Sequence, residues 1–241
     1  MRRKALLIGD FGSKDSYLSG VEYDLNNYAN FLKSLRGGAW CDSEISIYCN
    51  ASRDTILKEI MEIKQGVYDI VFAVFTGHGR YDNGEKCRML SINDEEISEK
   101  KLWDLAPKQI LILDSCSFLP NIAQESTKLN SLLLESRNSL ARLARQKYEN
   151  FCSQCPPQQI YLYASEIGTF ANDTENGGLY SINLLEALEK SEIQGQYLDI
   201  VEAHRNVVAK FKQKIKEPQK PEIKLQSSDS KLYIPGAIKD F

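Results

Sequence analysis

The stretch that decides the fold is Ile70-Val71-Phe72-Ala73-Val74-Phe75-Thr76-Gly77-His78-Gly79, and a second stretch of the same kind is Ile110-Leu111-Ile112-Leu113-Asp114-Ser115-Cys116. Each begins with a short, continuously apolar run, which is typical of a strand buried on both faces of a parallel sheet. Parallel strands of an open α/β sheet bring their C-terminal ends to one edge, where active sites form. If the two strands are neighbours, the imidazole of His78 and the thiol of Cys116 meet at this edge, as thiol catalysis requires.

Outside these two stretches, apolar runs alternate with helical patterns along the chain. This order predicts an α/β fold with a mostly parallel central sheet of about six strands, flanked by helices. The strands are expected at residues 4–8, 44–49, 70–75, 110–113, 160–164 and 231–234. Helical spacing of apolar residues predicts helices over residues 21–35, 52–64 and 199–215.

Length and composition narrow the class of protein. The chain has 241 residues, of which 42% are hydrophobic and 26% charged, as expected for one globular domain over residues 1–241. A net charge of −3 gives no electrostatic reason to expect a nucleic-acid partner. The apolar stretch after Met1-Arg2-Arg3-Lys4 is too short for a signal peptide, and no run is long enough to span a membrane. We therefore expect a cytoplasmic protein without a membrane partner.

The six cysteines indicate neither a disulfide framework nor a metal site. In a cytoplasmic domain of this size the thiols are expected to be free. Cys152 and Cys155 form a lone C-x-x-C, and no second pair of ligands at similar spacing completes a zinc site. We interpret both as unpaired loop thiols, and we predict no metal site and no cofactor.

Two segments break the regular alternation of strands and helices. Residues 119–158 form an insertion directly after Cys116, partly helical in pattern and rich in Lys and Arg. A lid or processing segment and a simple covering helix are both consistent with this pattern. The second segment, residues 212–230, is rich in Lys, Pro, Gln and Ser and is expected to be an exposed connection to the last strand.

Only two histidines compete for the role of catalytic base. His204 shares the apolar face of a predicted helix with Val201 and Val208, which is typical of a packed core residue. His78 stands between two glycines at the end of a strand, where the backbone can approach a substrate closely. A structural histidine in a tight turn is the alternative for His78. Cys116 alone would be interpreted as a small buried hydrophobe, and its pairing with His78 argues otherwise.

These motifs resemble those of the caspase-like clan of cysteine peptidases, and prokaryotic metacaspases or orthocaspases more than true caspases. The chain lacks the caspase Q-A-C-[RQG]-G signature. Two further stretches carry the resemblance, which extends from the first strand to about Leu188. They are Leu18-Ser19-Gly20-Val21-Glu22-Tyr23-Asp24, and Ala164-Ser165 through Phe170-Ala171 followed by Gly177-Gly178-Leu179-Tyr180-Ser181. The resemblance implies the three-layer caspase–hemoglobinase fold, with Ser165 in the wall of the substrate cleft.

The resemblance also implies roles for individual residues. Cys116 would attack the scissile carbonyl as a thiolate, and His78 would protonate the leaving amine. The backbone N–H groups of Gly79 and Cys116 would form the oxyanion hole. The family's primary specificity pocket (S1) maps to Asp24, Asp114 and Thr76. Two carboxylates in a narrow pocket favour an arginine or lysine at the substrate's P1 position, and not an aspartate.

Several expectations remain open at this level. Self-cleavage is predicted after one of the basic residues of the insertion, which are Arg137, Arg142, Arg145 and Lys147. Ser117-Phe118, Val21 and Tyr23 depart from the metacaspase pattern, which affects the expected shape of the pocket more than the dyad. The alternative function is a catalytically latent or inactive caspase-like scaffold, with any activating partner or regulator a separate polypeptide. The resemblance leaves calcium dependence open, and a nucleotide-binding protein is disfavoured because Gly9-Asp10-Phe11-Gly12 matches no phosphate-binding fingerprint.

Overall fold

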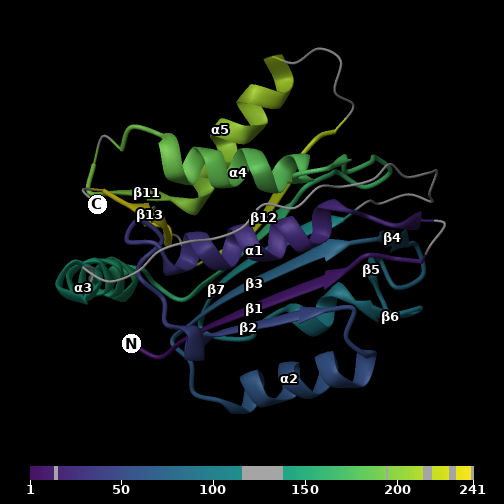
Figure 1. Cartoon of the computed structure of the whole chain (residues 1–241), viewed down its shortest axis with the longest axis horizontal. Coiled ribbons are helices and arrows are strands. Elements are labelled where there is room, and N and C mark those ends of the chain that lie inside the picture. The colour runs from purple at the N-terminus through teal and green to yellow at the C-terminus, as the bar shows by residue number, and fades with distance from the viewer. Residues whose placement is uncertain (14–15, 116–137, 194, 214–218, 228–231, 240–241) are drawn as a thin grey trace.

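The central sheet has six strands in the order β12-β8-β7-β3-β1-β2 (Figure 1). The computed structural model describes residues 1–13, 16–115, 138–193, 195–213, 219–227 and 232–239. The strands are β1 (Arg3–Asp10), β2 (Ile45–Cys49), β3 (Ile70–Gly77), β7 (Lys108–Ser115), β8 (Gln158–Tyr163) and β12 (Glu222–Ser227). All neighbours are parallel except β12, which is antiparallel to β8. The predicted mostly parallel sheet of six strands is therefore confirmed.

The two strands that decide the fold lie side by side at the centre of this sheet. Every residue of β3 is buried, and β7 is buried from its second residue onward, which explains their continuously apolar sequences. The register pairs Thr76 with Asp114 and Gly77 with Ser115. His78 therefore follows directly after the last paired residue of β3. Cys116 follows Ser115 in the sequence and lies outside the described residues.

Helices cover both faces of the sheet, which makes three layers. They are α1 (Gly20–Lys33), α2 (Arg53–Gln65), α3 (Asn138–Gln154), α4 (Leu179–Lys190) and α5 (Ile200–Gln213). Helix α2 lies on the face opposite α1 and α4 (Figure 1). Alternation along β1 divides its side chains between two apolar clusters: Ala5 and Leu7 pack on the side of α1 and α4, and Leu6 and Ile8 on the side of α2.

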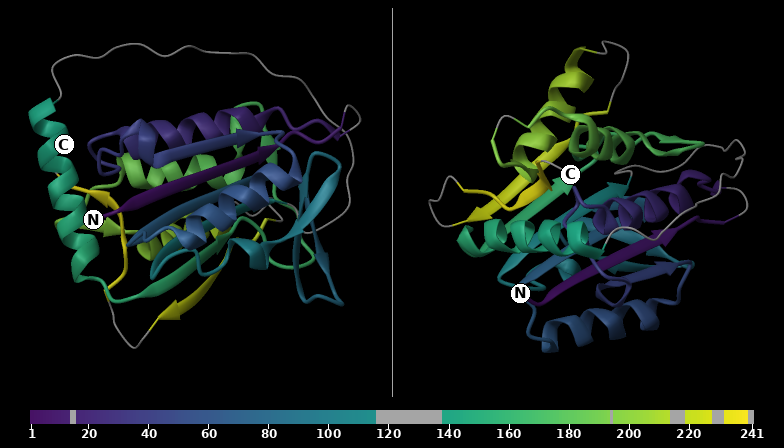
Figure 2. Two further views of the ribbon diagram at one scale, coloured as in Figure 1. Left: turned by 90° about the horizontal axis from the view of Figure 1, so that it is seen from below. Right: turned by 60° about the vertical axis from the view of Figure 1, so that its left-hand side comes forward.

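Three small sheets complete the fold. The first contains β4 (Gly79–Asp82), β5 (Cys87–Ile92) and β6 (Glu95–Ser98), the second β9 (Asp173–Thr174) and β10 (Gly177–Gly178), and the third β11 (Tyr197–Asp199) and β13 (Pro235–Ile238). Strands β4–β6 lie at the C-terminal end of the central strands, and α3 lies at the opposite end, near the N-terminus (Figure 2). The β4–β6 sheet therefore stands beside the edge at which β3 and β7 end.

The last strand of the central sheet is not where the sequence placed it. We expected a strand at residues 231–234, but residues 232–234 are outside any strand and β12 lies within the segment predicted to be an exposed connection. The predicted strand at residues 231–234 was wrong. The actual last strand, β12, was missed because it is an edge strand. Its Lys224, Leu225 and Gln226 are exposed, so its sequence lacks the apolar character of a buried strand.

The segment after the proposed nucleophile is described only from residue 138, where α3 begins. Arg142, Arg145 and Lys147 lie on α3, whereas Arg137 is outside the described residues. Cys152 and Cys155 are free, as predicted, but both are buried at the end of α3 and are not loop thiols. In the described part of the chain, no helix has the length and apolar character needed to cross a membrane.

Candidate functional site

His78 is held at the end of β3 by the loop that follows β1. Its imidazole Nε2 donates to the backbone carbonyl of Ser16, and its ring is partly exposed. Gly12 supports this approach, with a φ of +76° that L-residues rarely adopt. A Cβ at Gly12 would lie 2.6 Å from His78 Cδ2 and 2.7 Å from Nε2. The loop therefore fits closely around the imidazole only because residue 12 is glycine.

Asp24 is a fully buried carboxylate on α1, in the first turns of the helix. Its oxygens accept a hydrogen bond from the Thr76 hydroxyl at 2.7 Å and from the Gly178 backbone N–H at 3.0 Å. Burial raises the pKa of Asp24 well above its usual value, and the nearby charge of Asp114 raises it further. Asp24 thus joins α1, the end of β3 and the start of α4 in one buried group.

Asp114 provides the second buried carboxylate, one residue before the end of β7. Its Oδ2 accepts hydrogen bonds from the backbone N–H of Ser181 at 3.0 Å and from the Ser181 hydroxyl at 2.6 Å. Burial raises the pKa of Asp114 from 3.8 to about 6, and the hydrogen bonds from Ser181 only partly offset this rise. In the described part of the chain, no ion pair involves either Asp24 or Asp114.

Two glycines let the carboxylates of Asp24 and Asp114 approach the backbone just before α4. A side chain at Gly177 would collide with Asp24 Oδ1, and one at Gly178 would collide with Asp114 Oδ2. Gly177 also has a φ of +124°, which favours glycine. The Gly177-Gly178 pair, noted in the sequence as part of a cleft motif, therefore brings the two acids together at the start of α4.

A small hollow opens between these groups. It is lined by Leu18, Val21, Thr76, Gly77, Asp114, Ser115, Ala171, Asn172, Asp173 and Gly178. Its volume is about 20 Å³, which is room for about one water molecule. The hollow lies where the ends of β3 and β7 meet α1 and the β9–β10 pair. In this conformation it is too small for the side chain of an arginine or a lysine.

Sequence reasoning missed a third acid, Asp173, at the mouth of this hollow. Its Oδ2 accepts a hydrogen bond from the backbone N–H of Gly20 at 3.2 Å. Partial burial raises the pKa of Asp173, and the charge of His78 opposes that rise. The charge of Asp173 in turn contributes to the raised pKa values of Asp24 and Asp114. The only signal in the sequence was its place between two quoted motif segments, Phe170-Ala171 and Gly177-Gly178.

The remaining predicted site residues lie around the same strand ends. Gly79 is buried and begins β4, where it pairs with Leu90. Ser165, expected in the cleft wall, is buried, and its hydroxyl donates to the Ser115 carbonyl at 3.3 Å. Ser165 therefore ties the end of β8 to the residue before Cys116. Among the described residues, no group of three or more His, Cys, Asp or Glu side chains is arranged to hold a metal ion.

The second histidine belongs to the core, as its helical position predicted. His204 is buried on α5, and its Nδ1 shares a hydrogen bond of 2.8 Å with the Tyr180 hydroxyl. Burial lowers the pKa of His204 to about 4, so the ring is neutral at physiological pH. Because the His204 ring packs between α4 and α5, His204 is not a candidate for the base that activates Cys116.

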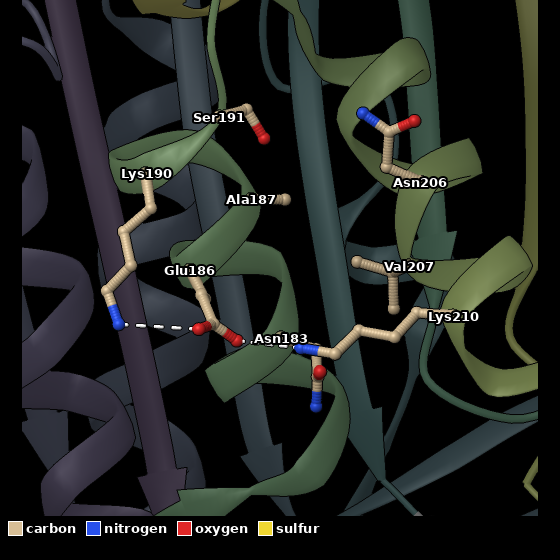
Figure 3. A pocket seen from close by; sticks show the side chains of 8 residues that line it. All are labelled: Asn183, Glu186, Ala187, Lys190, Ser191, Asn206, Val207 and Lys210. Atoms are coloured by element: carbon tan, nitrogen blue, oxygen red, sulfur yellow. Dashed lines mark hydrogen bonds and ion pairs between the residues drawn. The ribbon is translucent and has the colours of Figure 1, made fainter. Parts of the chain in front are cut away.

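A larger hollow between α4 and α5 lies apart from these groups. Its volume is about 240 Å³. Lys190 and Lys210 both point toward Glu186 at its rim, with Nζ–carboxylate distances of 3.3 and 2.7 Å (Figure 3). The two lysines of this hollow therefore share one carboxylate, that of Glu186.

Comparisons with known proteins agree with the fold. The family model of the caspase domain (peptidase C14) matches residues 2–233. A crystal structure of a protein from Geobacter sulfurreducens is similar with a TM-score of 0.65 and 14% identity, covering 98% of this chain and 97% of that one. Caspase-1 from Spodoptera frugiperda is similar with a TM-score of 0.57 and 15% identity, covering 94% of this chain and 87% of that one. No curated protein sequence matches the chain.

Proposed function

The chain belongs to the caspase-domain family of peptidases, and on that premise we propose that it is a cysteine endopeptidase with a His78/Cys116 dyad that cleaves after Arg or Lys. The observation that carries the proposal is the pair of buried carboxylates, Asp24 and Asp114, beside the strand end that precedes Cys116. Both have raised pKa values and neither has a cationic partner among the described residues, so the pair suits a cation from the substrate.

The proposed reaction is acyl transfer through a thioester. The Cys116 thiolate attacks the scissile carbonyl, and the resulting oxyanion accepts hydrogen bonds from the backbone N–H groups of Gly79 and Cys116. His78 gives its proton to the leaving amine as the C–N bond breaks, and water then hydrolyses the thioester. The parallel register of β3 and β7 supports this assignment, because His78 and Cys116 each follow a residue of the Gly77–Ser115 pair. This chemistry needs no cofactor.

The proposed specificity follows from the charge and hydrogen bonding of the S1 pocket. An arginine side chain would place its guanidinium between Asp24 and Asp114, with the Thr76 hydroxyl orienting Asp24. Arginine can bind bidentately to a carboxylate, whereas lysine provides a single point charge, so Arg is expected to be the better P1 residue. Asp173 adds negative charge at the mouth, where it would attract a basic side chain.

A latent state is a second candidate, favoured by two observations. The hollow beside Asp114 holds about one water molecule, and the imidazole of His78 donates to the Ser16 carbonyl. A substrate therefore needs the loop before α1 and the β9–β10 pair to move away from the strand ends. We propose that a separate protein or a ligand drives this opening in the cytoplasm. Self-cleavage after Arg137, Arg142, Arg145 or Lys147 is the accompanying proposal for processing.

Paired fluorogenic peptides test this function. Peptides that differ only in Arg, Lys or Asp at P1 are incubated with the wild type, Cys116→Ala and His78→Ala, with and without calcium. We expect hydrolysis after Arg and Lys only, lost in both variants. Asp24→Asn and Asp114→Asn should lower kcat/KM for the Arg peptide by roughly 10²-fold or more, because each removes a buried charge from the cation site.

The controls separate an inactive site from a closed one. Glu62→Gln removes an exposed carboxylate from α2, far from the strand ends, and should leave kcat/KM unchanged. Labelling of Cys116 by a peptide-chloromethylketone with Arg at P1 reports whether the pocket opens at all. Hydrolysis after Asp would overturn the specificity, and a folded protein that neither cleaves nor labels would support the latent scaffold.

A further inference from the structure

A cavity of about 410 Å³ lies apart from the proposed active site, between the β4–β6 sheet and the edge strand β12. Its size falls within the range of small-molecule sites. The charged residues that line it are Lys86, Arg88, Glu99, Glu222 and Lys224. None of the residues that line it also lines the hollow beside Asp114. The two hollows are therefore separate spaces in the fold.

A buried arginine dominates this cavity. The Arg88 side chain is 5% exposed, and its guanidinium lies 3.9 Å from the centre of the Tyr163 ring. The one carboxylate within ion-pair distance among the described residues is that of Glu222, at 3.5 Å, and this side chain is 43% exposed. A buried guanidinium is costly unless close acceptors compensate its charge. Its single long ion pair indicates room for a further anionic partner.

Two exposed lysines add to the positive charge of the cavity. Lys86 precedes β5, and Lys224 lies on β12 with its Nζ 4.3 Å from the centre of the Trp103 ring. The cation–π contact holds the Lys224 ammonium at the wall of the cavity. Three cationic side chains thus line the cavity, and they outnumber its two acidic side chains, Glu99 and Glu222. This arrangement suits an oxyanion, because Arg binds carboxylate and phosphate groups through paired hydrogen bonds.

The same arginine is linked to the proposed active site. Arg88 Nη2 donates to the backbone carbonyl of Ser165 at 2.8 Å, and the Ser165 hydroxyl donates to the Ser115 carbonyl at 3.3 Å. Two successive hydrogen bonds therefore link Arg88 in the cavity to Ser115, the residue before Cys116. An anion that draws the guanidinium toward the cavity would weaken its hold on the end of β8.

We propose that this cavity binds a small oxyanion, carrying a carboxylate or a phosphate group, through Arg88, Lys86 and Lys224, and that Arg88 and Ser165 transmit its binding to the end of β7. The first half is independent of the proposed peptidase function. The second half rests on Cys116 being the reactive thiol at that strand end.

Titration calorimetry with the full chain tests the binding. Pyrophosphate and succinate are the probes for the two kinds of oxyanion, and uncharged glucose is the control. We expect saturable binding of at least one anion, and its affinity should fall by about tenfold or more in the double variant Lys86→Gln/Lys224→Gln. The matched control Lys58→Gln/Lys190→Gln has the same net charge and removes two exposed lysines elsewhere. Arg88→Lys should weaken binding further, because lysine cannot bind bidentately.

The outcomes test anion binding and its link to the end of β7 separately. No saturable binding of either anion, or an equal loss in both double variants, overturns the site. The relative affinity for pyrophosphate and succinate identifies the ligand class. The link is tested by the rate at which iodoacetamide alkylates Cys116, followed by peptide mass spectrometry. Saturating anion should change this rate by about fivefold or more in the wild type and not in Ser165→Ala. An unchanged rate in the wild type overturns the link, and this assay requires no peptidase activity.

Discussion

The buried carboxylate of Asp114 should lower the stability of the protein as the pH rises, and the substitution Asp114→Asn should remove this dependence. Its folded pKa of about 6 exceeds the 3.8 of a free aspartate. Well below pH 3.8 the carboxyl is protonated in both the folded and the unfolded chain and has no effect on stability. Between these values only the unfolded chain loses the proton, so the free energy of unfolding falls as the pH rises. Above pH 6 the loss is complete.

The size of this effect follows from the pKa difference. At 1.36 kcal/mol for each pKa unit, the rise from 3.8 to about 6 corresponds to about 3 kcal/mol. For a chain of this length, about 3 kcal/mol corresponds to roughly 6–12 °C in Tm. In Asp114→Asn, the amide oxygen can still accept both hydrogen bonds from Ser181, while the charge is absent. The variant therefore resembles the protonated wild type.

The assay is thermal unfolding of the wild type and Asp114→Asn at a series of pH values between 4 and 8. We expect Tm values that converge as the pH falls toward 4 and a variant that is more stable by about 6–12 °C above pH 6.5. Taking the difference between the two proteins removes the contribution of groups that do not interact with Asp114. Glu44 is one of these: burial raises its pKa, but hydrogen bonds from Arg145 and Arg3 outweigh this effect and lower the pKa to about 2. Glu62→Gln, an exposed carboxylate, should show no such trend. A Tm difference that is independent of pH would refute the reasoning.

Two further substitutions test the packing around the site. Gly12→Ala forces a left-handed φ of +76° on an L-residue and places a methyl group against His78, so we expect a loss of about 1–2 kcal/mol in urea unfolding. Its kcat should fall more than the loss of stability explains, and an unchanged kcat would show that the loop does not hold the imidazole. Tyr180→Phe leaves the buried Nδ1 of His204 without its hydrogen bond, which should cost about 1–3 kcal/mol. Because His204 lies in the core, kcat at a temperature where the variant is folded should be unchanged.

The candidate site could be located in the sequence because its residues follow buried parallel strands. The apolar runs before His78 and Cys116 predict two central strands, and their register pairs Gly77 with Ser115. Asp24, Asp114 and Thr76 were selected through the resemblance to metacaspases, and the structure brings them together with Gly178. Asp173 was not selected, because an acid in a two-residue strand carries no sequence signal until the fold places it beside Gly20.

The sequence did not predict the edge strand β12, the β4–β6 sheet or the volumes of the two hollows. Strand β12 is exposed and polar, so its residues lack the pattern of a buried strand, and only pairing with β8 makes it part of the sheet. The β4–β6 sheet was not predicted at all, and the cavity around Arg88 exists only because this sheet packs near β12. The same is true of the closed hollow of about 20 Å³, whose volume depends on how loops from four segments meet.

The sequence by itself determined the parallel core and predicted where the candidate site lies, because burial on both faces of a strand demands a continuous apolar run that is visible in a single chain. Only the tertiary structure decided the charge state and the access of the site. The pKa values of Asp24 and Asp114 are raised by burial and by neighbouring carboxylates, Asp114 acting on Asp24 and Asp173 on both, and these effects depend on tertiary contacts. Such contacts join residues up to 154 positions apart, and local patterns in the sequence do not record them.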